Sequence, residues 1–128
     1  MQGNKLYNIL IVDDILVNRL LLKEIIEEFA NEIKEAENGK KAIEILQSGN
    51  IDLVLMDIEM PVMNGLETAR HIRNELKPPL NKVPIIALTA YNPSDFFEDL
   101  NDTCFDNLLT KPYSIKKVEN ALSSVDLK

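Results

Sequence analysis

The residues best suited to chemistry share one feature, because each stands at the end of a short apolar run. They are Asp13, Asp14, Asp57, Thr89 and Lys111. Three carboxylates brought together repel one another, so that one must take up a proton or a cation must lie among them. Mg²⁺ prefers hard oxygen ligands, and a pocket that also offers an ammonium and a hydroxyl suits a phosphoryl group. A carboxylate can itself accept that group and become an aspartyl phosphate.

The apolar runs themselves are typical of strands that are buried on both faces. Residues 9–12, 53–56 and 83–88 are too short for helices and apolar almost throughout, as in parallel sheets. Weaker strands are predicted at 33–36 and 108–109. Amphipathic stretches follow the strands and predict helices at 17–29, 42–46, 66–76, 93–104 and 115–125. In the first helix the apolar residues at helical spacing are Val17, Leu20, Leu21, Ile25 and Phe29.

Five βα units in succession predict an α/β fold with a parallel sheet covered on both faces. Five units cannot close a barrel of eight strands, which leaves an open, doubly wound sheet. Ligands of such sheets bind outside the carboxyl ends of the strands, at the topological switch point. The five polar residues above are therefore expected to meet at one edge of the sheet.

Composition narrows the classes of function further. The 128 residues suit one domain, and 14 basic against 21 acidic side chains give a net charge of −7. This acidic balance argues against nucleic acid as a partner. The single cysteine, Cys104, excludes an internal disulfide. We expect a cytoplasmic protein without direct membrane contact, because no apolar run approaches the roughly 20 residues of a span and no signal peptide is seen.

The chain resembles the receiver domain of two-component response regulators. The resemblance covers nearly the whole chain and is carried, in order, by ILIVDD (9–14), MDIEMPVMNG (56–65), PIIALTA (84–90) and KP (111–112). A lone acid pair or a lone Lys-Pro is weak evidence, but all four segments at strand ends are specific. The second and third segments, together with Val17-Asn18-Arg19, are similar in sequence to the corresponding segments in receivers of hybrid sensor histidine kinases.

The resemblance implies a fold and an assembly. It implies a flavodoxin-like sheet of five parallel strands in the order 2-1-3-4-5, with five helices on its two faces. Residues 1–128 would form a single receiver domain with a core of about 7–125, present as a monomer or weak dimer.

The resemblance also implies a role for each residue of the site. Asp57 would accept a phosphoryl group from a histidine kinase dimerisation domain or a histidine phosphotransfer protein. Thr89 would hydrogen-bond this group, and Lys111, ahead of a peptide bond to Pro112 that is often cis, would pair with it. Mg²⁺ would be held by Asp13, Asp14, Asp57 and the backbone carbonyl of Glu59. The domain would catalyse its own phosphorylation and dephosphorylation and have no turnover substrate.

Two positions depart from the family pattern, and two others bear on how long the phosphoryl group lasts. Leu108 stands where the family usually has Tyr or Phe, a ring that its switch couples to the threonine. Cys104 stands where a glycine often ends the fourth helix. Glu59 and Tyr91 occupy the positions that tune the phosphoryl lifetime, and we hypothesise that they limit the access of water.

Other interpretations stay open at this stage. Asp13 and Asp14 could cap the first helix, and Asp57 could be a turn residue. Exposed apolar residues of that helix could dock a four-helix phosphodonor. Leu108 favours a constitutive interaction module. Glu59, two residues past Asp57, stands where a phosphatase that forms an aspartyl phosphate would have its acid/base, but no segment that could cap a substrate is recognised. His71 is interpreted as a surface residue without a chemical role.

Overall fold

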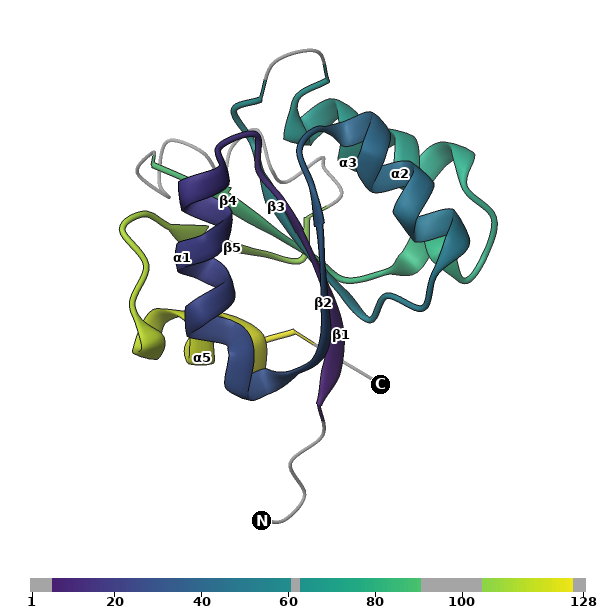
Figure 1. The fold of residues 1–128 in the computed structure, drawn as a ribbon. Helices are drawn as coiled ribbons and strands as arrows, with labels where there is room; N and C mark the ends of the chain where they lie inside the picture. Colours follow the sequence, from purple (N-terminus) through teal and green to yellow (C-terminus); the bar gives the residue numbers. More distant parts are fainter. Residues whose placement is uncertain (1–5, 61–62, 91–104, 126–128) are drawn as a thin grey trace.

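The computed structural model describes residues 6–60, 63–90 and 105–125. Its centre is a parallel sheet of five strands in the order β2-β1-β3-β4-β5 (Figure 1). The strands are β1 Tyr7–Val12, β2 Ala30–Ala36, β3 Leu53–Asp57, β4 Ile85–Thr89 and β5 Asn107–Thr110. The predicted doubly wound α/β fold and its strand order are confirmed.

Helices cover both faces of the sheet (Figure 1). α1 and α5 pack on one face, and α2 and α3 pack on the other. The α-helices are α1 Leu16–Ile26, α2 Gly39–Ser48, α3 Gly65–Glu75 and α5 Ile115–Ser123, with short 3₁₀ turns η1 Glu27–Phe29 and η2 Leu80–Lys82. The helix predicted at 93–104 lies outside the described residues, as do Tyr91 and Cys104. None of the helices in the described ranges has the length and apolar character that crossing a bilayer requires.

Side-chain caps fix the start of three helices. The Asn38 side chain accepts from the Lys41 amide at the start of α2, and Ser114 accepts from Lys117 at the start of α5. Asn64 and Glu67 form a reciprocal capping box at the start of α3. The Asn38 cap explains why α2 begins at Gly39, three residues before the predicted start at residue 42.

The strands are covered on both faces because their side chains alternate between two cores. Ile9 and Ile11 of β1 pack with α1 and α5, whereas Leu10 and Val12 pack with α2 and α3. All four are fully buried. This two-sided burial explains why β1, β3 and β4 read as continuous apolar runs. Met56 and Met60 pack in the core on the side of α2 and α3.

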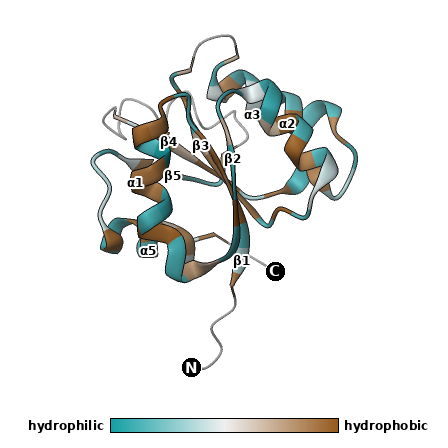
Figure 2. Ribbon diagram, viewed as in Figure 1, coloured by the Kyte–Doolittle hydropathy of each residue, from teal (hydrophilic) through white to brown (hydrophobic). Residues whose placement is uncertain are grey.

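One expected element needs correction, and one helix leaves part of its apolar set exposed. β2 begins at Ala30, three residues before the predicted start, because it is an edge strand whose exposed Asn31 and Glu32 conceal it. α1 packs through Leu22 and Ile26, while three members of its apolar set, Val17, Leu20 and Leu21, are at least half exposed. Figure 2 shows hydrophobic colour over the first turns of α1.

Candidate functional site

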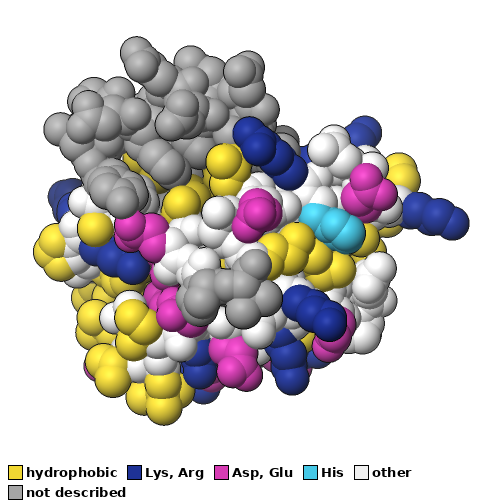
Figure 3. Space-filling model, turned by 90° about the horizontal axis from the view of Figure 1, so that it is seen from above, with side chains coloured by type: hydrophobic (Ala, Val, Ile, Leu, Met, Phe, Trp, Pro, Cys, Tyr) yellow, Lys and Arg dark blue, Asp and Glu magenta, His cyan; other side chains and the backbone are white. Residues whose placement is uncertain are grey.

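The predicted site residues converge at the carboxyl edge of the sheet. Asp13 and Asp14 follow β1, Asp57 ends β3, Thr89 ends β4, and Lys111 follows β5. These four strands are consecutive neighbours in the sheet. This edge lies at the top of Figure 1 and faces the viewer in Figure 3.

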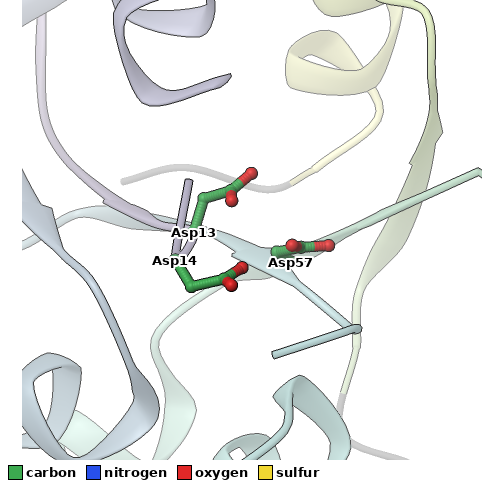
Figure 4. A group of neighbouring side chains, drawn as sticks. All are labelled: Asp13, Asp14 and Asp57. Atoms are coloured by element: carbon green, nitrogen blue, oxygen red, sulfur yellow. The ribbon is translucent and has the colours of Figure 1, made fainter. Parts of the chain in front are cut away.

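Three carboxylates form a cluster at this edge. One oxygen from each of Asp13, Asp14 and Asp57 lies within 4.8 Å of the others. Figure 4 shows the three side chains reaching toward the same space from the β1 loop and from the end of β3. Asp13 and Asp57 are 1% and 2% exposed, whereas Asp14 is open to solvent. The cluster is therefore buried on one side and accessible on the other.

The electrostatics of Asp57 reflect this crowding. Burial, and then the neighbouring Asp13 carboxylate, raise the pKa of Asp57 from 3.8 to about 6. Two groups oppose the rise: the Lys111 Nζ lies 3.4 Å from Asp57 Oδ1, and the Glu59 amide donates to the same oxygen at 3.4 Å. One ammonium does not offset the burial and the acidic neighbour, so that a further cation is favoured here.

The donor set fits a hard divalent ion. Every side chain of the cluster offers carboxylate oxygen, and no nitrogen or sulfur ligand accompanies them in the described residues. Oxygen donors with several negative charges are what Mg²⁺ binds. The backbone of Glu59 lies next to the cluster, since its amide contacts Asp57.

The backbone after Asp57 is held close to the start of α3. The Gly65 amide donates to the Ile58 carbonyl at 2.9 Å, and the Ile58 amide donates to Leu88 of β4 at 3.1 Å. A Cβ atom at position 65 would overlap the carbonyl oxygen of Asp57. Only glycine therefore permits this approach, and it brings the start of α3 against the strand end that carries Asp57.

Asp13 also organises the start of α1. Its Oδ1 accepts from the Ile15 amide at 2.9 Å, while Ile15 itself supplies no side-chain cap. The helix-start interpretation of Asp13 is thus correct in part and coexists with its place in the cluster. Asp14 makes no such bond to the helix among the described contacts.

Sequence reasoning missed two residues beside the site. The Arg19 guanidinium donates to the Asp13 carbonyl at 2.6 Å. The Tyr113 hydroxyl is buried without a hydrogen-bond partner in the described part of the chain. Burial, and then Asp13 and Asp57, raise the pKa of Tyr113. Arg19 stands in the Val17-Asn18-Arg19 segment, which signalled only the similarity to receivers of hybrid kinases. Tyr113 follows Lys111-Pro112, where the sequence offers an aromatic side chain but does not place it.

The remaining predicted positions are placed as follows. Leu108 lies in β5 opposite Ala87 and is partly buried. The Lys111–Pro112 peptide bond is cis. His71 is partly exposed on α3 and is not among the residues of the acidic cluster.

An apolar surface lies beside the acidic edge. We call it the α1 surface, and its large side chains are 50–69% exposed: Ile15, Leu16, Val17, Leu20 and Leu21. Figure 3 shows hydrophobic side chains gathered at the lower left of this view, on the side that α1 occupies in Figure 1. Ile115, at the start of α5, is 56% exposed.

Comparisons with known proteins agree with this geometry. The family model of the response regulator receiver domain matches residues 9–123. The aerobic respiration control sensor protein ArcB of Escherichia coli (strain K12) is 37% identical over 108 residues, which cover 84% of this chain and 14% of ArcB. The chain thus spans about one seventh of that relative.

Solved structures resemble the fold closely and include metal-bound forms. The response regulator TrrA of Thermotoga maritima, in complex with Mg²⁺-BeF, has a TM-score of 0.78 and 39% identity over 92% of this chain and 97% of TrrA. The receiver domain of the sensor histidine kinase PA1611 of Pseudomonas aeruginosa has a TM-score of 0.80 and 26% identity over 93% of this chain and 96% of its own. In that structure a magnesium ion is coordinated in the active site cleft.

Proposed function

The chain belongs to the family of response regulator receiver domains, and on that premise we propose that Asp57 is its phosphoacceptor. Receiver domains are signalling domains of phosphorelays. The observation that carries the proposal is the convergence of four strand ends on one carboxylate. Asp57 Oδ1 is faced by the Lys111 ammonium at 3.4 Å and by the acidic cluster, an arrangement that serves no evident need of the fold.

The proposed reaction moves a phosphoryl group from a phosphohistidine to Asp57. The phosphorus–nitrogen bond breaks while a bond forms between phosphorus and a carboxylate oxygen, and the imidazole keeps the electron pair and takes up a proton. Asp57 attacks as the carboxylate, so that Lys111 favours the reactive state by opposing the rise in its pKa. The Lys111 ammonium then pairs with an oxygen of the phosphoryl group, and the Thr89 hydroxyl donates to another.

We propose Mg²⁺ as the cofactor because the ligand set fits it. Asp13, Asp14, Asp57 and the backbone carbonyl of Glu59 would hold the ion. When bound, it supplies positive charge to the oxygens of the phosphoryl group. Asp13 and Asp14, at the end of β1, would contribute two negative charges to its binding. TrrA and the PA1611 receiver are relatives whose structures contain magnesium.

The phosphodonor is proposed to dock on the α1 surface. A histidine kinase dimerisation domain or a histidine phosphotransfer protein presents its histidine on a helix, and an apolar helix face matches the exposed Leu16, Leu20 and Leu21. Ile115 extends this surface toward the loop that carries Lys111. The donor histidine would then reach the acidic edge from the side of α1.

We further propose that the chemistry ends at Asp57. In the described residues this edge carries a cluster of three acids and one lysine that is partly open to solvent. Phosphorylation and hydrolysis of Asp57 would thus serve signalling. Steady-state hydrolysis of a small phosphoester, at a rate above that of the Asp57→Asn variant, would contradict this.

Intact-mass spectrometry tests the phosphoacceptor directly. The wild type is incubated with acetyl phosphate and Mg²⁺, beside a sample with EDTA and the Asp57→Asn variant. We expect one phosphoryl mass in the wild type alone, lost with EDTA. A beryllofluoride titration covers a short-lived adduct. Failure of both acetyl phosphate and beryllofluoride to modify or bind the wild type would overturn the proposal in favour of a constitutive interaction module.

A further inference from the structure

Arg19 connects three elements behind the acidic cluster. From α1 its Nη1 donates to the Asp13 carbonyl at 2.6 Å, and its Nε donates to Glu35 Oε1 on β2 at 2.9 Å. The Arg19 side chain is 15% exposed, so that it lies largely within the protein. A guanidinium suits this place because its rigid, planar fork can hold two acceptors at once.

Glu35 anchors this guanidinium. It stands in β2 opposite Ile11 of β1. Ile11 is two residues before Asp13, the first residue of the acid pair. Its other oxygen, Oε2, accepts from Lys23 at 3.0 Å. Hydrogen bonds from Lys23 and then Arg19 lower the pKa of Glu35, which keeps the anchor ionised at neutral pH.

Asp13 is thereby held from several directions. Its amide donates to the Ala36 carbonyl of β2 at 3.1 Å, its carbonyl accepts from Arg19, and its Oδ1 accepts from the Ile15 amide. Amide, carbonyl and carboxylate are thus each tied to a different part of the structure. Asp14 is the next residue along the same backbone, so that the geometry of both acids depends on this anchoring.

We propose that Arg19, oriented by Glu35, is a positioning residue for the metal site and fixes the β1–α1 loop that presents Asp13 and Asp14. This inference rests on the proposed function and deepens it. Residues that orient metal ligands without touching the metal commonly change its affinity 10–100-fold when they are mutated. Arg19 fits this description, because it contacts the backbone of a ligand and not the space between the three carboxylates.

Charge alone predicts the opposite result, which makes the inference testable by sign. A cation near three carboxylates weakens the attraction of a second cation, so that removal of the Arg19 charge by itself would tighten Mg²⁺ binding. Removal of a positioning contact would weaken binding instead. The direction of the change in affinity therefore separates the two roles.

Arg73 provides a matched control at the other end of the sheet. From α3 it donates to the carbonyls of Asn81 and Val83 at 3.0 and 2.7 Å and to the Asp106 carboxylate at 2.9 Å. Like Arg19, which contacts one backbone carbonyl and one acid, Arg73 joins a helix to backbone carbonyl oxygen and to a carboxylate. It lies near the amino end of β4, away from the acidic cluster.

The experiment is a titration of the ¹⁵N-labelled protein with MgCl₂, followed by amide chemical shifts, for the wild type, Arg19→Ala, Arg19→Lys and Arg73→Ala. Urea unfolding gives the stability of each variant. We expect Arg19→Ala to weaken Mg²⁺ binding about 10-fold, Arg19→Lys to weaken it less, and Arg73→Ala to leave it within twofold of the wild type at a similar loss of stability. Affinity of Arg19→Ala that is unchanged or tighter would overturn the inference.

A second variant covers the case in which Arg19→Ala does not fold. Glu35→Asp keeps the negative charge but shortens the side chain that holds the guanidinium, so that charge alone predicts no change. We expect it to weaken Mg²⁺ binding severalfold; unchanged affinity would overturn the inference. Mg²⁺ binding by the wild type distinguishes a failure of the proposed function from a failure of the role of Arg19. No saturable binding of Mg²⁺ by the wild type would overturn the proposed function as well, whereas wild-type binding with no loss in these variants overturns only the role of Arg19.

Discussion

Aspartate serves opposite purposes at the two edges of the sheet. At the amino edge, Asp52 Oδ2 accepts from the Asn8 amide at 2.8 Å, and Asp106 Oδ2 accepts from the Ile85 amide at 2.8 Å. Asp106 is also paired with Arg73. Each of these carboxylates satisfies an amide at the start of a strand, the second of β1 and the first of β4, so that charge at this edge stabilises the fold.

At the carboxyl edge the same residue type is crowded and only weakly compensated. Asp57 faces Asp13, and its cation, Lys111, stands 3.4 Å away. The raised pKa of Asp57 shows that its charged form is disfavoured in the folded protein. The acids of the amino edge thus complete the fold, whereas those of the carboxyl edge carry an unfavourable interaction that a cation can relieve.

The largest expected effect is on the rate of phosphoryl transfer. Lys111→Ala removes the ammonium that contacts Asp57 at 3.4 Å in the described residues. We expect incorporation from acetyl phosphate to slow about 100-fold, as on loss of a group that stabilises transition-state charge. Lys82→Ala, at an exposed lysine near the amino edge, is the control and should not change the rate. Equal rates for wild type and Lys111→Ala in a time course by intact mass would remove Lys111 from the site.

The next effect is a gain in stability when the acidic edge loses a charge. Asp57 has a higher pKa folded than unfolded, so that its stabilising contribution is complete below about 4 and is lost as the pH rises through about 6. Asp57→Asn should therefore be more stable than the wild type at pH 8 in EDTA, by up to about 3 kcal/mol, with a smaller difference at pH 4. Urea unfolding at both pH values measures this. A less stable Asp57→Asn at pH 8 would contradict the comparison of the two edges.

At the amino edge the corresponding change should have the opposite sign. Asp106→Ala leaves the Ile85 amide without its acceptor and removes one partner of Arg73, and we expect a loss of about 2 kcal/mol. Mg²⁺ binding should be unaffected in the same protein. Urea unfolding beside a magnesium titration checks both statements, and a stabilised Asp106→Ala would show that the amino edge is not paired as described.

The smallest expected effect concerns the lifetime of the phosphoryl group. Glu59 is exposed next to Asp57, and Tyr91 follows β4 beyond the described residues. If these side chains restrict the access of water, Glu59→Ala and Tyr91→Ala should each shorten the half-life of the phosphorylated protein severalfold. Decay of the adduct mass after removal of the donor gives the half-life, and unchanged lifetimes in both variants would reject the hypothesis.

The sheet and its acidic edge could be predicted because the physics is local in the sequence. A strand buried on both faces must be apolar throughout, as Ile9–Val12 is, and the residue that ends it points to the site edge. Asp13, Asp57, Thr89 and Lys111 are accordingly placed as predicted. β2 was predicted too short because only one part of this edge strand is buried.

The contacts between elements could not be read from the sequence in the same way. Arg19 and Glu35 lie 16 residues apart on a helix and a strand, and no periodicity links them. Helical spacing also fails to tell which apolar residues of α1 are covered, so that Leu22 and Ile26 are buried while Leu20 and Leu21 are not. The pairing of Asp52 and Asp106 with strand amides was likewise invisible, because a single aspartate before a strand reads as a turn residue.

The most direct test of the account is to find which aspartate carries the phosphoryl group. The wild type is phosphorylated with acetyl phosphate and Mg²⁺, reduced with borohydride so that an aspartyl phosphate becomes homoserine, digested, and mapped by tandem mass spectrometry. We expect homoserine at position 57 and neither at position 52 nor at position 106 of the amino edge. Modification of Asp13, Asp14, Asp52 or Asp106 in place of Asp57 would contradict it.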